Sequence, residues 1–291
     1  MALIQNRYCV VRELAQTTYG AIYLCTDELL RPRRVVLKSV SLVHAMNLLD
    51  MGHLWMHSLD DPRQEKAFAN MQRAETAPHP HIVQYLDDFI EGHTLYFVLE
   101  YCAGGDLYYA VSRGQNRRLA CADALAVVKQ VASGVAYLHS RNIAHRDLSL
   151  ENVMLSRGVC KIGDFGLAAR ADRLCVDRVG KAYYMAPEVV APWSVYDPKA
   201  ADMWSLGMIF FILVTGSPLV QLATQEDSAF RAFEQVGVRE VLNIWGVTNL
   251  LEGSAMELLD GMLQCDPAER LTIDQVLNHH GLMQRPAATG A

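Results

Sequence analysis

Hydrophobic and polar positions follow two different periods along this chain, and the period changes near residue 103. Before it, β-branched and aromatic residues gather in short runs separated by turn residues, which is typical of strands. The runs that we predict to be strands are 8–14, 21–28, 33–42, 81–90 and 94–102. The last two are expected to pair as a hairpin across 91–93. A helix is predicted over 63–75, after an irregular segment over 43–62, and the basic cluster at 31–34 is interpreted as a turn between strands.

After residue 103 the apolar positions recur at helical spacing. Within 122–140, for example, Leu125, Val128 and Val131 are followed by Val135 and Leu138 on the same helical face. Two short β segments are predicted at 152–156 and 159–164, and further helices continue to about residue 283. The tail is expected to be disordered. The pattern predicts an α+β fold whose parts are a small β-rich lobe with one main helix (8–99), a hinge (100–106), a larger helical lobe (107–283) and the tail (284–291).

Composition narrows the class of protein. The chain has 291 residues, 51% of them hydrophobic, which is enough for one large domain or two lobes. Its 26 basic and 32 acidic side chains give a net charge of −6, so it lacks the basic footprint of a nucleic-acid or membrane-surface protein. The seven cysteines are odd in number and form no CxxC pair, which indicates reduced thiols inside the cell.

No segment has the pattern of a targeting or membrane sequence. The N-terminus lacks the long apolar core of a signal peptide. The longest apolar stretch, 206–214, is far shorter than the roughly 20 residues that cross a bilayer, so we interpret it as a buried helix. We therefore expect a soluble intracellular protein of the cytoplasm or nucleus, with no nucleic-acid partner and no membrane insertion.

Five short motifs occur in order along the chain. They are VVLK at 35–38, HRDLSLEN at 145–152, DFG at 164–166, YMAPE at 184–188 and DMWSLG at 202–207. In this order and at this spacing, residues 8–283 resemble the catalytic domain of a eukaryotic protein kinase of the serine/threonine branch. The resemblance implies a bilobal protein-kinase-like fold. It also implies transfer of the γ-phosphate of ATP to hydroxyl groups of protein substrates, with ATP and Mg²⁺ as cofactors.

The motifs contain the residue types that phosphoryl transfer requires, because this reaction depends mainly on neutralising and aligning phosphates. By the resemblance, Asp164 and Asn152 offer hard oxygen ligands to Mg²⁺. Lys38 neutralises the inner phosphates, and Asp147 accepts or orients the proton of the attacking hydroxyl. Outside this order, a single Asp is more often a helix cap and a single strand Lys is more often a solvated edge.

Lys38 needs a carboxylate on the helix that follows it. The usual family spacing leads to Asn70, which cannot form the ion pair, and Glu75 lies too close to the next turn. We therefore assign the partner to Glu65, near the start of the predicted helix. The alternative is that Glu65 is solvated and the pair is absent.

The resemblance also assigns an ATP pocket. Besides Lys38, Glu65 and Asp164, its residues are Leu14, Ala15, Gly20, Ile22, Val36, Leu99, Glu100, Cys102, Asp106 and Met154. In this assignment Leu99 lines the back of the adenine site, and the backbone of Glu100 and Cys102 binds the adenine edge. Branched or flexible side chains at 22, 36 and 154 enclose the purine, and Asp106 reaches the ribose or a basic substrate residue.

Two further predictions concern architecture. Asp202, at the start of the buried helix, is expected to accept hydrogen bonds from backbone amides of the catalytic loop. Glu188 is expected to pair with Arg270 in a buried ion pair. Removing one partner of such a pair costs about 3–5 kcal/mol, because the other charge is left buried.

The phosphate-covering loop departs from the family pattern G-x-G-x-x-G. The segment AQTTYG at 15–20 keeps only Gly20, while Ala15 and Thr17 occupy the first two glycine positions. Because glycine lets backbone amides approach phosphate, we expect weaker ATP binding, not its absence. Thr18 and Tyr19 at the tip are candidate inhibitory phosphorylation sites. The alternative is that the aromatic ring folds under the loop.

The activation segment, 164–188, contains no Ser or Thr between Gly166 and Tyr183. In the family, the arginine beside the catalytic acid, here Arg146, pairs with a phosphorylated residue of this segment. The equivalent position here is Asp177, so a carboxylate is expected to give Arg146 a permanent partner. The alternative is that Asp177 is a solvated loop acid.

The catalytic loop itself lacks the lysine that serine/threonine kinases carry two residues after the acid, and has Ser149 there. The position of the family's threonine, just after the last glycine of the activation segment, holds Lys181. A cation and a hydroxyl have exchanged places. We expect Lys181 to reach the γ-phosphate from the opposite strand and Ser149 to supply a hydroxyl to Asp147. The alternative is that Lys181 is a solvated loop cation.

Three functions remain open. The leading one is a serine/threonine protein kinase, since Lys38, Asp147, Asn152 and Asp164 are all present. A pseudokinase-like nucleotide-binding scaffold is the alternative favoured by the degraded glycine loop and by Ser149. A tyrosine or dual-specificity kinase is the third, although the sequence after Asp147 lacks the alanine and arginine usual in tyrosine kinases.

Overall fold

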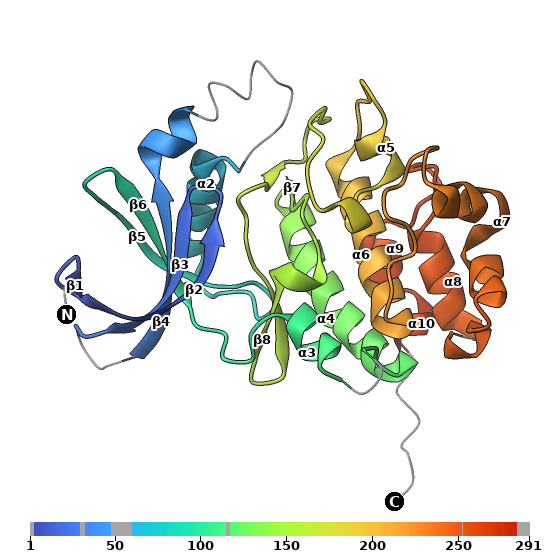
Figure 1. The fold of residues 1–291 in the computed structure, drawn as a ribbon, viewed down its shortest axis with the longest axis horizontal. Coiled ribbons are helices and arrows are strands. Elements are labelled where there is room, and N and C mark those ends of the chain that lie inside the picture. The colour runs from blue at the N-terminus through green and yellow to red at the C-terminus, as the bar shows by residue number, and fades with distance from the viewer. Residues whose placement is uncertain (1–2, 30–32, 48–59, 115–116, 252, 284–291) are drawn as a thin grey trace, which may run out of the picture.

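The computed structural model describes residues 3–29, 33–47, 60–114, 117–251 and 253–283. It has a lobe built on a β-sheet and a larger helical lobe, with the N-terminal strands in the first and the last helices in the second (Figure 1). The predicted disordered tail and most of the predicted irregular segment lie outside the described residues.

The smaller lobe is a six-stranded antiparallel sheet in the order β1-β2-β3-β4-β6-β5. Its strands are β1 (Leu3–Ile4), β2 (Tyr8–Thr17), β3 (Gly20–Asp27), β4 (Arg33–Ser41), β5 (Tyr85–Glu91) and β6 (Thr94–Glu100). The predicted β5–β6 hairpin is confirmed. The predicted strand start at Arg33 is confirmed, so the turn predicted at 31–34 is wrong for Arg33 and Arg34, which already pair with β3.

Helix α2 (Pro62–Arg73) packs against this sheet, as predicted. It begins after Asp61, whose side chain accepts the N–H of Arg63, with proline in the first turn. A second helical stretch at 42–47 stands where an irregular segment was expected. The signal for it was Ser41, whose hydroxyl accepts the N–H of His44 in the manner of an N-cap.

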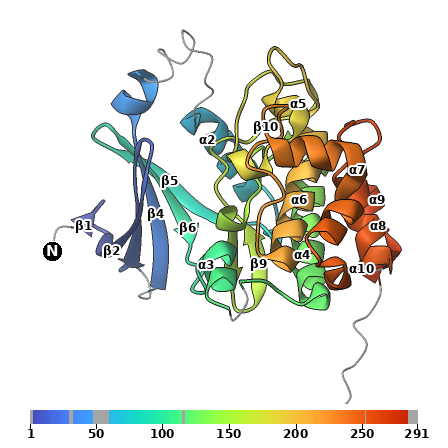
Figure 2. The same ribbon diagram turned by 45° about the vertical axis from the view of Figure 1, so that its right-hand side comes forward.

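The larger lobe contains most of the helices. Its elements are α3 (Leu107–Ser112), α4 (Cys121–Ser140), β7 (Ile143–Ala144), η1 (Leu150–Asn152), β8 (Val153–Ser156), β9 (Val159–Ile162), β10 (Ala169–Arg170), η2 (Ala182–Tyr184), α5 (Pro187–Val190), α6 (Pro198–Thr215), α7 (Ser228–Ile244), η3 (Thr248–Leu250), α8 (Gly253–Met262), α9 (Ile273–Leu277) and α10 (His280–Met283). The predicted helix over 122–140 and the two predicted short β segments are confirmed by α4, β8 and β9. Figure 2 shows α4 and α6 inside this lobe.

Helix α6 is the centre of the core, so the buried helix predicted at 206–214 is confirmed. Leu206, Ile209, Phe210 and Phe211 are all inaccessible to solvent. By length and composition alone, α4 and α6 could each cross a membrane. In this fold they pack against each other, and most of α6 is covered by protein. Their apolar character is accounted for by the core.

Candidate active site

A cleft of about 640 Å³ lies between the two lobes. The predicted residues that line it are Leu14, Ala15, Ile22, Val36, Lys38, Glu65, Leu99, Glu100, Cys102, Asp106, Asn152, Met154 and Asp164. Sequence reasoning missed several other lining residues, among them Arg12, Tyr109 and Glu151. Arg12 and Tyr109 belong to none of the five motifs, and Glu151 lies in the motif at 145–152 but was given no role there.

The hinge between β6 and α3 lines the cleft with its backbone. The N–H of Cys102 has no backbone acceptor among the described residues, whereas the N–H of Glu100 donates to the carbonyl of Gln84. The Glu100 side chain is held by Lys161, whose Nζ lies 2.8 Å from Oε1. One carboxylate oxygen of Asp106 is already hydrogen-bonded, because it caps α3 by accepting the N–H of Tyr109.

Gly20 is needed for a reason other than the predicted one. A Cβ atom at this position would lie 2.3 Å from the carbonyl oxygen of Ser39 on β4, so only glycine allows the two strands this close approach. Gly20 is not among the residues that line the cleft. Ala15 and Thr17 lie in β2, paired with β3, where the backbone requires no glycine. The expected weakening of ATP binding stays a prediction.

Tyr19, at the tip between β2 and β3, is folded under the loop. Its side chain is 4% exposed and its ring meets His44 edge-on, with centroids 5.9 Å apart. Burial raises the pKa of Tyr19 to about 12, and its hydroxyl has no hydrogen-bond partner among the described residues. The alternative weighed from the sequence is therefore confirmed, and the Tyr19 hydroxyl is inaccessible to a modifying enzyme. Thr18 is exposed.

Replacing Tyr19 with phenylalanine should leave the free energy of unfolding within about 1 kcal/mol of the wild type, because the lost hydroxyl makes no bond. Nucleotide affinity should not change. Urea unfolding and a nucleotide-binding titration measure both quantities. A loss well above that value would show that the hydroxyl has a partner after all.

Lys38 is the charged centre of the cleft. Its Nζ lies 2.8 Å from Oε2 of Glu65 and 2.8 Å from Oδ1 of Asp164. Burial lowers the pKa of Lys38, but the two carboxylates outweigh it and the net shift is upward, so the ammonium is charged. Glu65 is buried and also accepts the hydroxyl of Tyr85 at 2.7 Å. The predicted pair is confirmed, while Asn70 is exposed on α2.

The DFG motif joins the two lobes. The ammonium of Lys38 holds the pKa of Asp164 at about 2, while burial acts in the opposite direction. A depressed pKa keeps this carboxylate ionised until the pH falls toward that value. Phe165 is inaccessible to solvent and stacks on Phe68 of α2, with centroids 3.8 Å apart. The position of the metal motif is therefore coupled to that of α2.

The start of α2 also contacts this motif, through two acids that the sequence did not single out. The N–H of Asp61 donates to the carbonyl of Gly166 at 3.0 Å. A Cβ atom at Gly166 would lie 3.0 Å from Cγ of Asp60, so this glycine makes room for the approach. Burial raises the pKa of Asp60, and the charge of Asp164 adds to this effect while Lys38 opposes it. No periodic signal marked these acids, because they follow a segment without a pattern.

Asp202 holds the catalytic loop in place through backbone hydrogen bonds, as predicted. Its two carboxylate oxygens accept the N–H groups of His145 and Arg146, both at 2.8 Å. Within the loop, Nδ2 of Asn152 donates to Oδ2 of Asp147 at 2.7 Å. The Oδ1 atom of Asn152 accepts no hydrogen bond from the described residues, so this oxygen is free to act as a ligand.

Lys181 lies beside the catalytic acid. Its Nζ is 2.6 Å from Oδ2 of Asp147, so Lys181 lies beside the catalytic loop as predicted and is not an unpaired loop cation. Its contact with the γ-phosphate stays a prediction. The predicted bond from Ser149 to Asp147 is also wrong. Ser149 is fully buried, and its Oγ has no hydrogen-bond partner among the described residues. Asn152 and Lys181 both bind Oδ2 of Asp147, while Oδ1 is also buried without a partner, so the Ser149 hydroxyl and the carboxylate do not meet in this fold.

The activation segment is tied to the catalytic loop by the predicted contact. Nη1 of Arg146 lies 3.0 Å from Oδ2 of Asp177, and Nε of Arg146 donates to the carbonyl of Leu167. Tyr196 adds a contact that the sequence did not reveal, since its hydroxyl donates to the carbonyl of Asp177 at 2.7 Å. The built-in carboxylate thus occupies the position at which the family carries phosphate.

The predicted pair of Glu188 and Arg270 is confirmed. The guanidinium donates from both terminal nitrogens, at 2.6 Å and 3.0 Å, to the two carboxylate oxygens. The Arg270 side chain is inaccessible to solvent. This pair anchors the end of the activation segment to the helical lobe.

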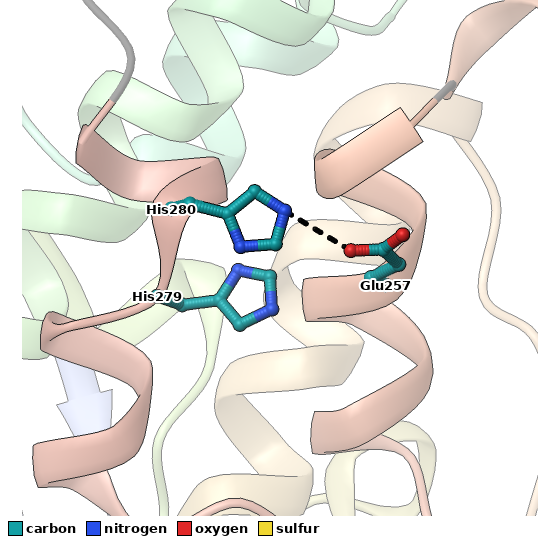
Figure 3. A group of neighbouring side chains, drawn as sticks. All are labelled: Glu257, His279 and His280. Carbon is teal, nitrogen blue, oxygen red and sulfur yellow. Dashed lines mark ion pairs between the residues drawn. The ribbon is translucent and has the colours of Figure 1, made fainter.

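One cluster outside the cleft contains typical metal-ligand types. Glu257 of α8 pairs with His280 of α10, whose ring stacks on that of His279 (Figure 3). The two rings are 4.5 Å apart and only 23° from parallel, so their in-plane lone pairs cannot converge on one ion. Nδ1 of His279 also accepts the N–H of Gly281. We interpret the cluster as a contact between α8 and α10.

Comparison with known proteins agrees with this geometry. The family model described as the protein kinase domain matches residues 8–281. The chain belongs to the protein kinase family. Kinases of this family transfer phosphate from ATP, with Mg²⁺, to hydroxyl groups of proteins. The chain's bilobal architecture is the one expected from the family.

Its curated relatives include serine/threonine kinases and calcium-dependent kinases. It is 35% identical over 205 residues to "Serine/threonine-protein kinase PLK4" of Drosophila grimshawi, covering 69% of this chain and 26% of that protein. It is 30% identical over 284 residues to "Calcium-dependent protein kinase 34" of Arabidopsis thaliana, covering 95% of this chain and 50% of that protein. The chain therefore spans between about a quarter and a half of these relatives.

Proposed function

We propose that this kinase domain is a catalytically active serine/threonine protein kinase that uses ATP and Mg²⁺. The observation that carries the proposal is the position of the Lys38 ammonium, 2.8 Å from both Glu65 and Asp164. A pseudokinase scaffold is less well supported, because none of the residues that phosphoryl transfer requires is missing from the site. The serine/threonine relatives favour that branch over a tyrosine kinase.

Each residue has a role that follows from its contacts. Lys38 binds the inner phosphates of ATP. The N–H of Cys102 donates a hydrogen bond to an acceptor atom on the adenine edge. Asp164 and Oδ1 of Asn152 are the oxygen ligands for Mg²⁺, which supplies positive charge to the phosphates when bound. Asp147 orients the substrate hydroxyl and accepts its proton. Lys181, next to Asp147, stabilises the charge that develops on the transferred phosphoryl group.

The experiment that tests the function uses the purified chain with radiolabelled Mg-ATP and a generic protein substrate. We expect label on serine and threonine, and none with an Asp164→Ala control. Phosphoamino-acid analysis separates serine/threonine from tyrosine transfer. Nucleotide binding without transfer in the wild type would favour the scaffold and contradict the proposal.

Asp177→Ala should lower the rate several-fold, with no phosphorylation of the wild type required for activity. The buried guanidinium of Arg146 would lose its carboxylate, whereas Tyr196 would still hold the backbone, so the loss should be partial. A carboxylate also has less charge than a phosphate, about −1 against −1.5 to −2.

Asp172→Ala is the matched control, since Asp172 lies in the same segment but pairs with the exposed Arg170. Steady-state kinetics of enzyme shown by mass spectrometry to be unphosphorylated measures both variants. An unchanged rate in Asp177→Ala, or a wild type that is inactive until phosphorylated, would contradict this mechanism.

A further inference from the structure

An exposed patch lies beside the catalytic loop, on the activation segment and the loop after α5. We call it the activation-segment patch, and its residues are Arg173, Leu174, Val176, Arg178, Trp193 and Val195. The exposed fractions of its apolar side chains range from 59% to 83%. The two segments lie next to α5, at the opposite end of the larger lobe from the β8–β9 turn (Figure 1).

A short antiparallel pairing directs the apolar side chains outward. Cys175 and Tyr196 exchange two backbone hydrogen bonds, each 2.9 Å long. Side chains alternate between the two faces of such a pair. Cys175 and Tyr196 are buried, so Leu174, Val176 and Val195 point to solvent on the other face. Their exposure is a consequence of the pairing and does not depend on a mobile side chain.

Trp193 is the most exposed large apolar residue of the patch, at 83%. Its φ of +59° is in the left-handed region, which is strained for a residue with a bulky side chain. Because this indole is exposed to solvent, its packing does not stabilise the isolated domain. Tryptophan is among the residues that contribute most to protein–protein binding when they fill a pocket of the partner.

The charges of the patch are positive and unpaired. Both acids in this part of the segment already form ion pairs, Asp172 with Arg170 and Asp177 with Arg146. Arg173 and Arg178 are exposed, and neither forms an ion pair or hydrogen bond with any residue that the structure describes. A chain with a net charge of −6 therefore presents a local cationic surface here.

We propose that the activation-segment patch binds the part of a protein substrate that flanks the acceptor hydroxyl, and that it selects acidic and apolar residues there. The inference rests on the proposed kinase activity. The patch is continuous with the reacting groups, because Arg178 is only three residues from Lys181, which contacts Asp147. A second copy of the chain fits less well, because it would bring the same cations to the patch across a two-fold axis.

Two peptides with the same acceptor serine test the selection. One has aspartate and leucine on both sides of the serine, and the other has lysine and alanine at the same positions. In the wild type we expect kcat/KM to be at least about ten-fold higher for the acidic peptide. Arg173→Glu with Arg178→Glu should lower that ratio about ten-fold or more, mainly through KM.

Matched variants separate the patch from general surface charge. Arg157→Glu changes an exposed arginine on the β8–β9 turn, far from the patch, and should leave the ratio unchanged. Trp193→Ala should raise KM for the acidic peptide several-fold. Equal kcat/KM for the two peptides in the wild type, or a ratio that the double variant does not alter, would overturn the inference.

Binding of the fluorescently labelled acidic peptide, measured by anisotropy, tests the patch without catalysis. If neither peptide is phosphorylated, the proposed activity fails while this measurement still decides the patch. Weaker binding by the Arg173→Glu, Arg178→Glu variant supports the inference, and equal binding overturns it. A dimer of the wild type that Trp193→Ala abolishes would assign the patch to a second copy and would also overturn it.

Discussion

Replacing Lys181 with alanine is expected to lower kcat by about 10²–10³-fold, as loss of other electrostatic stabilisers does. The family lysine two residues after the catalytic acid is absent, and Nζ of Lys181 is instead 2.6 Å from Oδ2 of Asp147. Charge develops on the transferred phosphoryl group next to this carboxylate, so a cation at this position has its largest effect in the transition state.

Ser149→Ala is the matched control for Lys181→Ala. The Ser149 hydroxyl is buried without a hydrogen-bond partner among the described residues, so removing it should leave kcat close to the wild-type value. The two variants therefore separate the cation from the hydroxyl. A Lys181→Ala enzyme with near-normal kcat, measured at saturating ATP, would contradict the assigned role.

Restoring the family order tests the same exchange by rescue. Ser149→Lys alone would add a second cation at a fully buried position of the catalytic loop, and should be inactive or unstable. Combined with Lys181→Thr, it should recover much of the lost rate. The two changes should be strongly non-additive because each lysine would supply the same single cation beside Asp147. Additive losses would show that the two positions are independent.

Arg270→Met is expected to destabilise the larger lobe by about 3–5 kcal/mol, the usual cost of leaving one buried charge without its partner. The Arg270 side chain is inaccessible to solvent, and it donates two hydrogen bonds to the carboxylate of Glu188. It also donates to the carbonyl oxygens of Ala200 and Gln264. The variant would strand these acceptors as well as the carboxylate.

Urea unfolding followed by tryptophan fluorescence measures this loss, since Trp204 lies in contact with Arg270. Adding Glu188→Gln to Arg270→Met should restore part of the stability, because no unpaired charge then remains. Arg170→Ala, which breaks the exposed pair with Asp172, should produce no measurable change. Equal destabilisation by the buried and exposed changes would contradict the account.

The sequence by itself determined the family and the residues that carry chemistry. Lys38, Asp147, Asn152 and Asp164 were identified because their types and order along the chain meet the needs of phosphoryl transfer. The β5–β6 hairpin and helix α4 were predicted because side-chain periodicity and turn residues are properties of neighbouring positions. Glu65 was found by excluding the other candidate positions for the Lys38 partner.

Only the tertiary structure decided the contacts between distant segments. Ser149 was expected to bond to Asp147, but its hydroxyl and Oδ1 of Asp147 are each buried without a partner among the described residues. Gly20 is required by the backbone of β4, and not by its place in a phosphate loop. Trp193 and the pairing of Cys175 with Tyr196 had no sequence signal. The physical reason is that side-chain orientation and close approach depend on how whole elements pack, and local patterns do not encode that packing.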